Sequence, residues 1–343
     1  MQIKLLDIKD SSLWDEYVKS NKAASIYHLS TWAGITEKIF GHKTYYLYSV
    51  DKYHCVTGVL PLVRLKSFLF GDFMVSIPFY NYGGVLGDRY EIENALMQYA
   101  CDMSDEMRLS HIEFRHIKEY GPKWQVRTDK VVMELMLPDS SDDLWKGFKP
   151  KLRAQIRKPT KEGAYVESGG IGLLDDFYRV FAENMRDLGT PVYPKKFFKE
   201  ILLEFPNQAF LMTVSYQGKP VAAAFLLGYR DRLEIPWASS LRKYNPLGVN
   251  MLLYWEVLQK AIKKGYKVFD FGRSTVDAGT YRFKKQWGAQ PKQLYWHYCV
   301  NENCAMPNIT PNNPKYKLAI SIWQQLPLPV ANFLGPRIVK YLP

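Results

Sequence analysis

FDFGRSTVDAGTYRFKKQWGA, residues 269–289, is the stretch of the sequence that most constrains the fold. Its first residues are typical of a buried strand, which delivers Asp270 and is expected to break at Gly272. A polar loop follows, and then a short helix carries Lys284 and Lys285 back toward the end of the strand. Open α/β sheets bind their ligands outside the carboxyl ends of such strands. The stretch therefore predicts an α/β domain with a site at this strand end.

Two parts of the chain repeat one order of elements: a β-hairpin, an Ile-Pro-aromatic triplet, a helix and a strand. The first copy covers residues 45–63, 77–79, about 91–105 and 112–115, and the second covers 210–227, 235–237, about 250–264 and 268–271. Matched elements at matched spacing are the mark of an internal repeat. The sequence therefore predicts that one α/β unit was duplicated.

The predicted fold is α/β (α+β), with two tandem domains. A chain of 343 residues is long for one domain, and its apolar fraction of 47% is enough for a sizeable core. We expect a first domain over residues 1–145, a second over 146–300 and a tail over 301–343. The second domain carries the stretch at 269–289.

The chain is basic, with a formal net charge of +12 and an isoelectric point near 9.3. This suggests an anionic partner such as RNA, a phosphorylated carrier, a coenzyme or an acidic membrane surface, although many cytosolic enzymes are mildly basic without one. The sequence contains no GxSxG, Walker or GxGxxG motif. Serine hydrolysis, phosphoryl transfer and hydride transfer are therefore disfavoured.

The cysteines and the hydropathy pattern predict a cytoplasmic protein. Cys55, Cys101, Cys299 and Cys304 form no CxxC pair and have no histidine at zinc spacing, so we expect four reduced thiols in a reducing compartment. No cationic start leads into an apolar run, and no stretch of about 20 apolar residues occurs. Neither a signal peptide nor a membrane span is expected.

Several motifs of the second domain resemble those of the FemABX family. Phe283-Lys284-x-x-Trp287-Gly288-Ala289 is similar to the family's FKxxFGA signature, with Trp in place of Phe, and Arg273 stands where the family often has a second glycine. Residues 152–163 resemble the basic helix that opens the family's second domain, and residues 177–186 resemble the next helix. Residues 28–32 are similar to the start of the family's first domain. Together these matches cover about residues 25–295.

A narrower resemblance joins residues 76–84, 184–191, 236–242 and 269–275 to the FemAB subfamily associated with PEP-CTERM/exosortase exopolysaccharide loci. Membership would imply two tandem GNAT-like (acyl-CoA N-acyltransferase) domains. It would also imply transfer of an aminoacyl or acyl group to an amine of a cell-envelope or exopolysaccharide precursor, which is often lipid-linked. The donor would be aminoacyl-tRNA or acyl-CoA, with no tightly bound cofactor, no metal and no DNA partner. Two alternatives remain: an N-acyltransferase that depends on acyl-CoA or an acyl-carrier protein, and a non-catalytic GNAT-like module that binds a polysaccharide intermediate or a partner protein.

The resemblance and the chemistry of amide formation single out two catalytic candidates. The family lysine implicated in transition-state stabilisation corresponds to Lys284, and an ammonium group suits developing charge on a carbonyl oxygen. Asp270 is a candidate acceptor for the amine proton, although an Asp at a strand end equally well caps the following loop. Two lysines on a short helix are otherwise most often a solvated face.

A second set of candidates shares a suitability for substrate or phosphate groups: Arg153, Arg157, Arg186, Arg242, Arg273, Lys285 and Tyr82. The basic run at 149–161 fits a tRNA acceptor stem or a pyrophosphate, or else a solvated helix face. Arg186 matches a family arginine that contacts a substrate phosphate. Arg242 and Gly248 precede a helix, where a GNAT domain holds coenzyme A pyrophosphate, but the usual RxxGxG/A pattern is missing. Residues 81–84 read as a tight turn or a ligand-lining loop.

The tail is apolar and basic. Pro327, Pro329 and Pro336 prevent one long helix, and Arg337 and Lys340 add positive charge. Two alternatives remain open: the tail packs on the body of the protein, or it brings the protein to the inner face of the cytoplasmic membrane.

Overall fold

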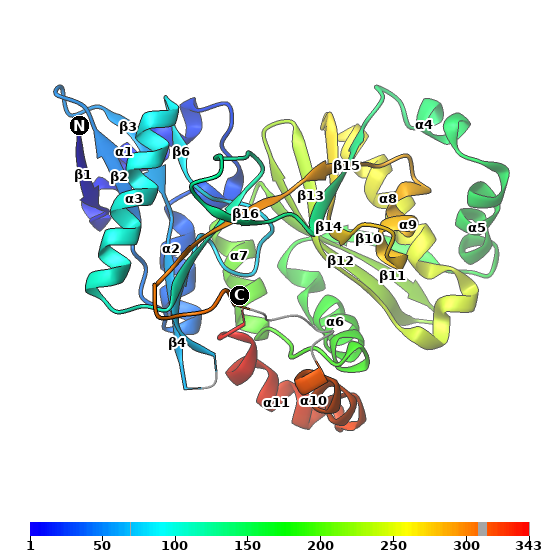
Figure 1. The fold of residues 1–343 in the computed structure, drawn as a ribbon. Coiled ribbons are helices and arrows are strands. Elements are labelled where there is room, and N and C mark those ends of the chain that lie inside the picture. Colours follow the sequence, from blue (N-terminus) through cyan, green and yellow to red (C-terminus); the bar gives the residue numbers. More distant parts are fainter. Residues whose placement is uncertain (69, 308–313, 343) are drawn as a thin grey trace. The chain divides into compact units, whose positions relative to one another are not determined.

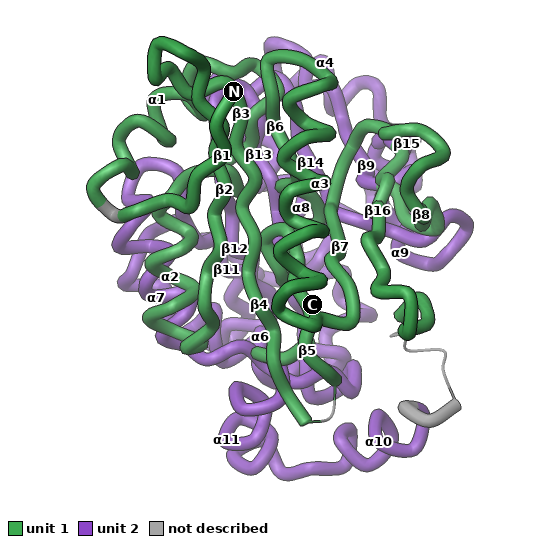
Figure 2. The backbone as a smooth tube through the Cα atoms, turned by 60° about the vertical axis from the view of Figure 1, so that its left-hand side comes forward, with its two compact units in different colours: residues 1–131, 293–309, 340–343 green, residues 132–292, 310–339 purple. Residues whose placement is uncertain are grey.

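The structure, a computed structural model, describes residues 1–68, 70–307 and 314–342 (Figure 1). The chain divides into two compact units (Figure 2). Unit 1 comprises residues 1–131, 293–309 and 340–343, and unit 2 comprises 132–292 and 310–339. The units differ from the predicted domains, because the chain returns to unit 1 after residue 292 and most of the tail belongs to unit 2.

Unit 1 contains a four-stranded sheet, β1-β2-β3-β6, and a five-stranded sheet, β4-β5-β7-β16-β8. Its helices are α1 (Ser11–Ser20), α2 (Thr31–Phe40) and α3 (Tyr90–Glu106), with 3-10 turns η1 (Ile8–Asp10) and η2 (Ile26–His28). Its strands are β1 (Gln2–Leu5), β2 (Leu47–Val50), β3 (Val56–Leu60), β4 (Val63–Ser67), β5 (Gly71–Val75), β6 (Leu86–Gly87), β7 (His111–His116), β8 (Gln125–Arg127) and β16 (Tyr295–Val300).

The core of unit 1 is a βαβ arrangement. Strands β5 and β7 pair in parallel, Met74 opposite Ile112, and α3 connects them. Ile92, Leu96 and Ala100 recur at helical spacing on α3 and are buried against β2, β3 and β7. The predicted first helix and strand are thus confirmed.

Strand β16 explains why the chain returns to unit 1. It lies between β7 and β8, antiparallel to both, with Tyr295 opposite His116 and Trp296 opposite Arg127. The backbone of β16 supplies hydrogen-bond partners for the N–H and C=O groups on one edge of β7. The sequence predicted that the second domain extends to residue 300. In the structure, residues 293–300 belong to unit 1.

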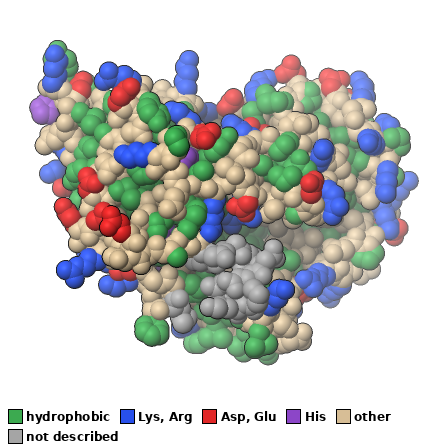
Figure 3. Space-filling model, in the orientation of Figure 1, with side chains coloured by type: hydrophobic (Ala, Val, Ile, Leu, Met, Phe, Trp, Pro, Cys, Tyr) green, Lys and Arg blue, Asp and Glu red, His purple; other side chains and the backbone are tan. Residues whose placement is uncertain are grey.

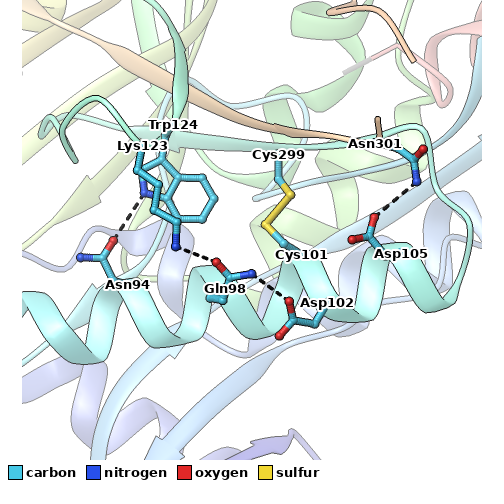
Figure 4. The surroundings of a disulfide bond; sticks show 9 residues. All are labelled: Asn94, Gln98, Cys101, Asp102, Asp105, Lys123, Trp124, Cys299 and Asn301. Atoms are coloured by element: carbon cyan, nitrogen blue, oxygen red, sulfur yellow. Dashed lines mark hydrogen bonds between the residues drawn. A yellow bond between two sulfur atoms is a disulfide. The ribbon is translucent and has the colours of Figure 1, made fainter. Parts of the chain in front are cut away.

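A disulfide joins Cys101 of α3 to Cys299 of β16 (Figure 4). Asn301 also donates a hydrogen bond to the Asp105 carboxylate, 3.3 Å away, in the next turn of α3. The expectation of four free thiols is therefore wrong for this pair. The two cysteines are 198 residues apart in sequence, and only the placement of β16 beside β7, under α3, brings them together.

Unit 2 is built on a seven-stranded sheet, β10-β11-β12-β13-β14-β9-β15. Its strands are β9 (Lys130–Met136, starting at the boundary), β10 (Tyr165–Gly169), β11 (Ala209–Tyr216), β12 (Lys219–Tyr229), β13 (Arg232–Ser240), β14 (Val268–Thr275) and β15 (Gln290–Gln293). Its helices are α4 (Ser141–Gly147), α5 (Pro150–Lys161), α6 (Leu174–Leu188), α7 (Lys195–Glu204), α8 (Val249–Lys263), α9 (Gly279–Lys285), α10 (Pro314–Gln325) and α11 (Leu328–Val339), with 3-10 turns η3 (Ile171–Leu173) and η4 (Arg242–Leu247).

The same βαβ order recurs in unit 2, where β13 and β14 pair in parallel and α8 connects them. The hairpin β11–β12 precedes them, as predicted. The repeat fails at the Ile-Pro-aromatic triplets. Residues 235–237 lie within β13, whereas Ile77 and Phe79 follow β5 in a loop with φ of 51° and 76°. The sequence similarity at these triplets therefore does not reflect equivalent backbone.

In the tail, residues 314–325 and 328–339 form two helices, α10 and α11, that pack on α6. Pro327 separates α10 from α11, as expected of proline. Pro336 lies inside α11, which continues to Val339, so the expectation that it breaks the helix is wrong. Within the residues that the structure describes, we find no helix that combines the length and apolarity needed to cross a membrane.

The disulfide predicts a simple thiol titration. The unfolded, unreduced chain should expose two reactive thiols, Cys55 and Cys304, and the reduced chain four. Reduction should also lower the free energy of unfolding by about 2–4 kcal/mol, because the cross-link restricts the unfolded state. Cys55→Ser is the control and should remove one thiol without a change in stability. Four reactive thiols in the unreduced chain would contradict the pairing.

Candidate functional site

A pocket of about 170 Å³ opens in unit 2. Four elements contribute its lining, namely α6, the end of β13, the start of α8, and α9. The lining residues are Asn184, Ala238, Ser239, Ser240, Asn250, Leu253, Tyr254 and Phe283. The pocket therefore lies at the carboxyl end of β13, whereas the sequence predicted a site at the end of the neighbouring strand β14.

The pairing of β13 with β14 accounts for an opening at this place. Their parallel register covers Arg232–Glu234 against Val268–Asp270. Both strands run on beyond it, β13 to Ser240 and β14 to Thr275. We infer that the two strands part after Glu234. Side chains of α6, α8 and α9 then line the space beyond.

The pocket has a polar side and an aromatic side. Asn184 of α6 donates a hydrogen bond to the Ser239 hydroxyl, 3.1 Å away, which fixes both side chains. Tyr254 stacks on Phe271 and meets Phe283 edge-on, with ring centroids 5.0 Å apart. Burial raises the pKa of Tyr254, so its phenol stays neutral. A neutral, hydrogen-bonding cavity of this size suits a small polar group.

Lys284 is buried on α9, directly after the pocket residue Phe283. Its side chain is 7% exposed, and Nζ donates hydrogen bonds to the carbonyls of Gly272 and Arg273, at 3.0 and 2.8 Å. Burial lowers its pKa from 10.5 to about 8, an effect that Asp270 opposes and Arg273 increases. Lys284 is not among the lining residues of the pocket. Its ammonium group holds the end of β14.

Asp270 is fully buried and serves as a cap for the following backbone. Its Oδ1 accepts a hydrogen bond from the Gly272 N–H at 2.7 Å, and its Oδ2 lies 3.5 Å from Arg232 Nη1. Gly272 has φ of 75°. The strand nevertheless continues to Thr275, so the predicted break at Gly272 is wrong. The glycine turns the backbone within β14 instead, as in a β-bulge.

Two predicted phosphate ligands converge on Asp187 at the end of α6. Arg186 pairs with the Asp187 carboxylate at 2.7 Å and donates to the Leu326 carbonyl at 3.1 Å. Arg242 donates to the Asp187 carbonyl at 2.6 Å. Both arginines therefore make structural contacts, which tie α6 to the tail and to η4.

The basic helix α5 presents its charges to solvent. Arg157 is exposed and lies over the Trp145 ring, 4.9 Å from its centroid, while Arg153 is half-buried. Lys158 donates to the Pro246 carbonyl in η4, just before α8. The end of α5 thus lies beside the start of α8, which leaves a phosphate-binding role open.

Arg273 and Lys285 lie on the surface near the strand end. The Arg273 backbone carbonyl accepts from Lys284, and its side chain is exposed. Lys285 is exposed and lies 5.8 Å from the centroid of the Tyr281 ring. The structure thus separates the two lysines of α9 into a buried one and a solvated one.

Tyr82 lies in unit 1, within an aromatic cluster. It is buried and meets Tyr27 edge-on, with ring centroids 5.8 Å apart. A Cβ at Gly84 would lie 2.1 Å from His116, so the glycine is required by close packing. The loop at 81–84 is therefore a packed turn, and Tyr82 is not among the residues that line the pocket of unit 2.

None of the residues that line the pocket was among the candidates predicted from the sequence. Asn184, Ser239 and Ser240 fall within stretches that carry the narrower resemblance, and Asn250 and Tyr254 lie four residues apart on α8. This i, i+4 spacing places both on one helix face. The sequence alone indicates this helix face, but it does not indicate that the end of β13 lies against it.

Residues 147–285 match the family model described as an acetyltransferase (GNAT) domain. This stretch of unit 2 is thus similar to a GNAT domain. A search of curated proteins finds no match to the chain. By structure the chain is similar to FemX, with 15% identity, a TM-score of 0.64, and coverage of 93% of this chain and 100% of FemX.

Two further solved structures share the fold. L-PGS from Bacillus licheniformis has 12% identity and a TM-score of 0.57, with coverage of 94% of this chain and 99% of that one. A tandem GNAT protein from the clavulanic acid biosynthesis pathway has 10% identity and a TM-score of 0.57, with coverage of 90% and 99%. The prediction of two GNAT-like domains in an α/β fold is confirmed. The PEP-CTERM subfamily is not tested by these likenesses.

Across residues 1–68, 70–307 and 314–342, no group of three or more His, Cys, Asp or Glu side chains is placed to hold a metal ion.

The buried ammonium of Lys284 predicts a pH dependence of stability. Between pH 8 and 10.5 the unfolded chain binds more protons at this residue than the folded chain, so the free energy of unfolding should rise with pH. The contribution is on the order of 3 kcal/mol. Lys284→Met should remove it, whereas Lys285→Met, at the solvated neighbour, should not. Urea unfolding across this pH range measures the difference, and equal slopes in the protein and Lys284→Met would contradict the assignment.

Proposed function

We propose that unit 2 transfers an acyl group from an anionic carrier to an amine and forms an amide bond at the pocket. The observation that carries the proposal is the small polar cavity at the carboxyl end of β13, which α9 lines with Phe283, the residue directly before the buried Lys284. The GNAT match over residues 147–285 supports the same class of reaction.

The surroundings of α8 favour a carrier with phosphate groups. The first N–H groups of a helix attract anions, and Arg242 and Lys243 precede this helix in η4. Lys158 reaches the same turn from α5. The space between the ends of β13 and β14 would accommodate an extended arm of the carrier. Amide groups on this arm would form hydrogen bonds with the strand backbone, as an added strand does. Acyl-CoA fits this description first, and aminoacyl-tRNA is the alternative donor.

The reaction needs few groups from the protein. The amine nitrogen attacks the acyl carbonyl, the bond from the carbonyl carbon to the carrier's sulfur or oxygen breaks, and the proton lost by the nitrogen ends on that departing atom. Charge develops on the carbonyl oxygen, where a positioned donor stabilises the transition state. We assign this role to Lys284. The Asp270 carboxylate accepts a hydrogen bond from the Gly272 N–H. We therefore assign Asp270 to positioning Lys284 and the backbone at Gly272 rather than to accepting the proton.

The acceptor that we propose is an amine of a cell-envelope or exopolysaccharide precursor. This rests on the resemblance of the motifs to the FemABX family and on the shared fold with FemX. Arg153, Arg157, Arg273 and Lys285 remain candidates for its charged groups. Arg186 and Arg242 are weaker candidates, because Asp187 and the tail already engage them.

A second candidate function is a GNAT-like module that binds such ligands without turnover. The engagement of Arg186 and Arg242 in structural contacts favours it. Binding of a CoA thioester without acyl transfer would identify this alternative.

Lys284→Met is expected to lower the rate of acyl transfer by about 100-fold or more, because it removes a donor to the developing oxyanion. Lys263→Met, at an exposed lysine in the last turn of α8, is the matched control and should retain the rate. The assay offers short-chain acyl-CoA or aminoacyl-tRNA with amino-sugar and amino-acid amines, and follows release of the carrier. A folded Lys284→Met protein with full activity would overturn the mechanism.

Ala238→Leu is expected to raise the KM for the donor by at least about tenfold, because its larger side chain fills part of the pocket. Ala154→Leu makes the same change on the exposed face of α5 and should have no effect. Thermal shift with the donor measures binding separately from turnover. Equal KM values for the two variants would remove the pocket from the proposal.

A further inference from the structure

The two tail helices present large apolar side chains to solvent. Leu318 and Ile322 of α10 are 70% and 56% exposed, and Val330 and Phe333 of α11 are 40% and 61% exposed. We call these four residues the outer tail face. In Figure 3, hydrophobic side chains gather at the lower edge of the view, where α10 and α11 lie in Figure 1.

The opposite faces of the same helices make the contacts with unit 2. Ala331 and Gly335 are buried, and a Cβ at Gly335 would lie 2.8 Å from the Val192 backbone. Gln324 donates to the Asp187 carbonyl at 3.1 Å. Docking on the body thus uses one side of each helix. An apolar residue on the other side adds nothing to that docking, so the outer tail face requires another explanation.

Beyond Glu302, all charged side chains of the tail are positive. From Asn303 to Pro343 the sequence contains no Asp or Glu, and its cations include Lys317 and Arg337. Both are exposed and lie on the same helices as the outer tail face. Arg337 is stacked on Phe333, with its guanidinium carbon 3.8 Å from the ring centroid. Apolar side chains flanked by cations, with no acidic residue, match a partner that has anionic groups at its surface and an apolar layer beneath them.

We propose that the outer tail face rests on an anionic phospholipid bilayer. Leu318, Ile322 and Phe333 would enter the boundary between headgroups and acyl chains, while Lys317 and Arg337 contact lipid phosphates. Each helix has 12 residues, which suits a position in the plane of the interface rather than across it. A second copy of the chain is the poorer occupant, because self-pairing would bring the cations of two tails together.

The test uses the full chain and co-sedimentation with vesicles. Vesicles of phosphatidylethanolamine and phosphatidylglycerol should retain the protein, vesicles of phosphatidylcholine should retain less, and salt should weaken the binding. Leu318→Ser/Phe333→Ser should lower the partition coefficient at least about tenfold. The matched control is Ile171→Ser/Leu203→Ser, at two exposed apolar residues elsewhere in unit 2, and it should bind like the unaltered protein.

A second pair of substitutions separates charge from apolar contact. Lys317→Gln/Arg337→Gln should weaken binding to the anionic vesicles and leave the weak binding to phosphatidylcholine unchanged. Unaltered protein that stays in the supernatant with both vesicles would overturn the proposal, as would apolar variants that bind normally. A dimer in solution that Leu318→Ser/Phe333→Ser dissociates would also overturn it and assign the face to a second copy. Transfer to a soluble amine tests the proposed function independently.

Discussion

The buried ammonium of Lys284 is the constraint on which the candidate site depends. Removal of a charge from water costs several kcal/mol unless hydrogen bonds and an opposite charge compensate. Here the carbonyls of two successive residues, Gly272 and Arg273, accept from one amine. Successive carbonyls of a regular strand point to opposite sides, so the backbone must turn between them. Gly272, with φ of 75°, allows that turn, and the carboxylate of Asp270 fixes it by accepting the Gly272 N–H.

The same strand end relates the lysine to the pocket. Because β13 and β14 pair only near their starts, their carboxyl ends are available to α6, α8 and α9. Helix α9 supplies Phe283 to the pocket and Lys284 to the strand, since adjacent residues on a helix point in different directions. A change at either strand end would therefore alter the cavity and the environment of the ammonium together.

The sequence predicted the helices and strands that local patterns determine. The hairpin β11–β12, the helices α3 and α8 and the short helix with Lys284 follow from period, turn residues and helix-ending glycines. It did not predict contacts between residues far apart in the chain. The return of β16 to β7, the pairing of Cys101 with Cys299 and the engagement of Arg186 by Leu326 all join segments more than 100 residues apart. For the same reason the residues of the pocket, from four separate elements, could not be grouped beforehand.

Helix α6 connects the tail to the pocket. Asn184 bonds to Ser239 inside the cavity, and Arg186 and Asp187, less than one turn further along α6, hold the tail through Leu326 and Gln324. Three residues of α-helix span about 4.5 Å, so the two sets of contacts are adjacent on one rigid element. The arginine that the motif matched to a substrate phosphate thus also contacts the tail. If the outer tail face rests on a bilayer, this short connection would hold the pocket close to the membrane surface, where an amine on a lipid-linked acceptor would be presented.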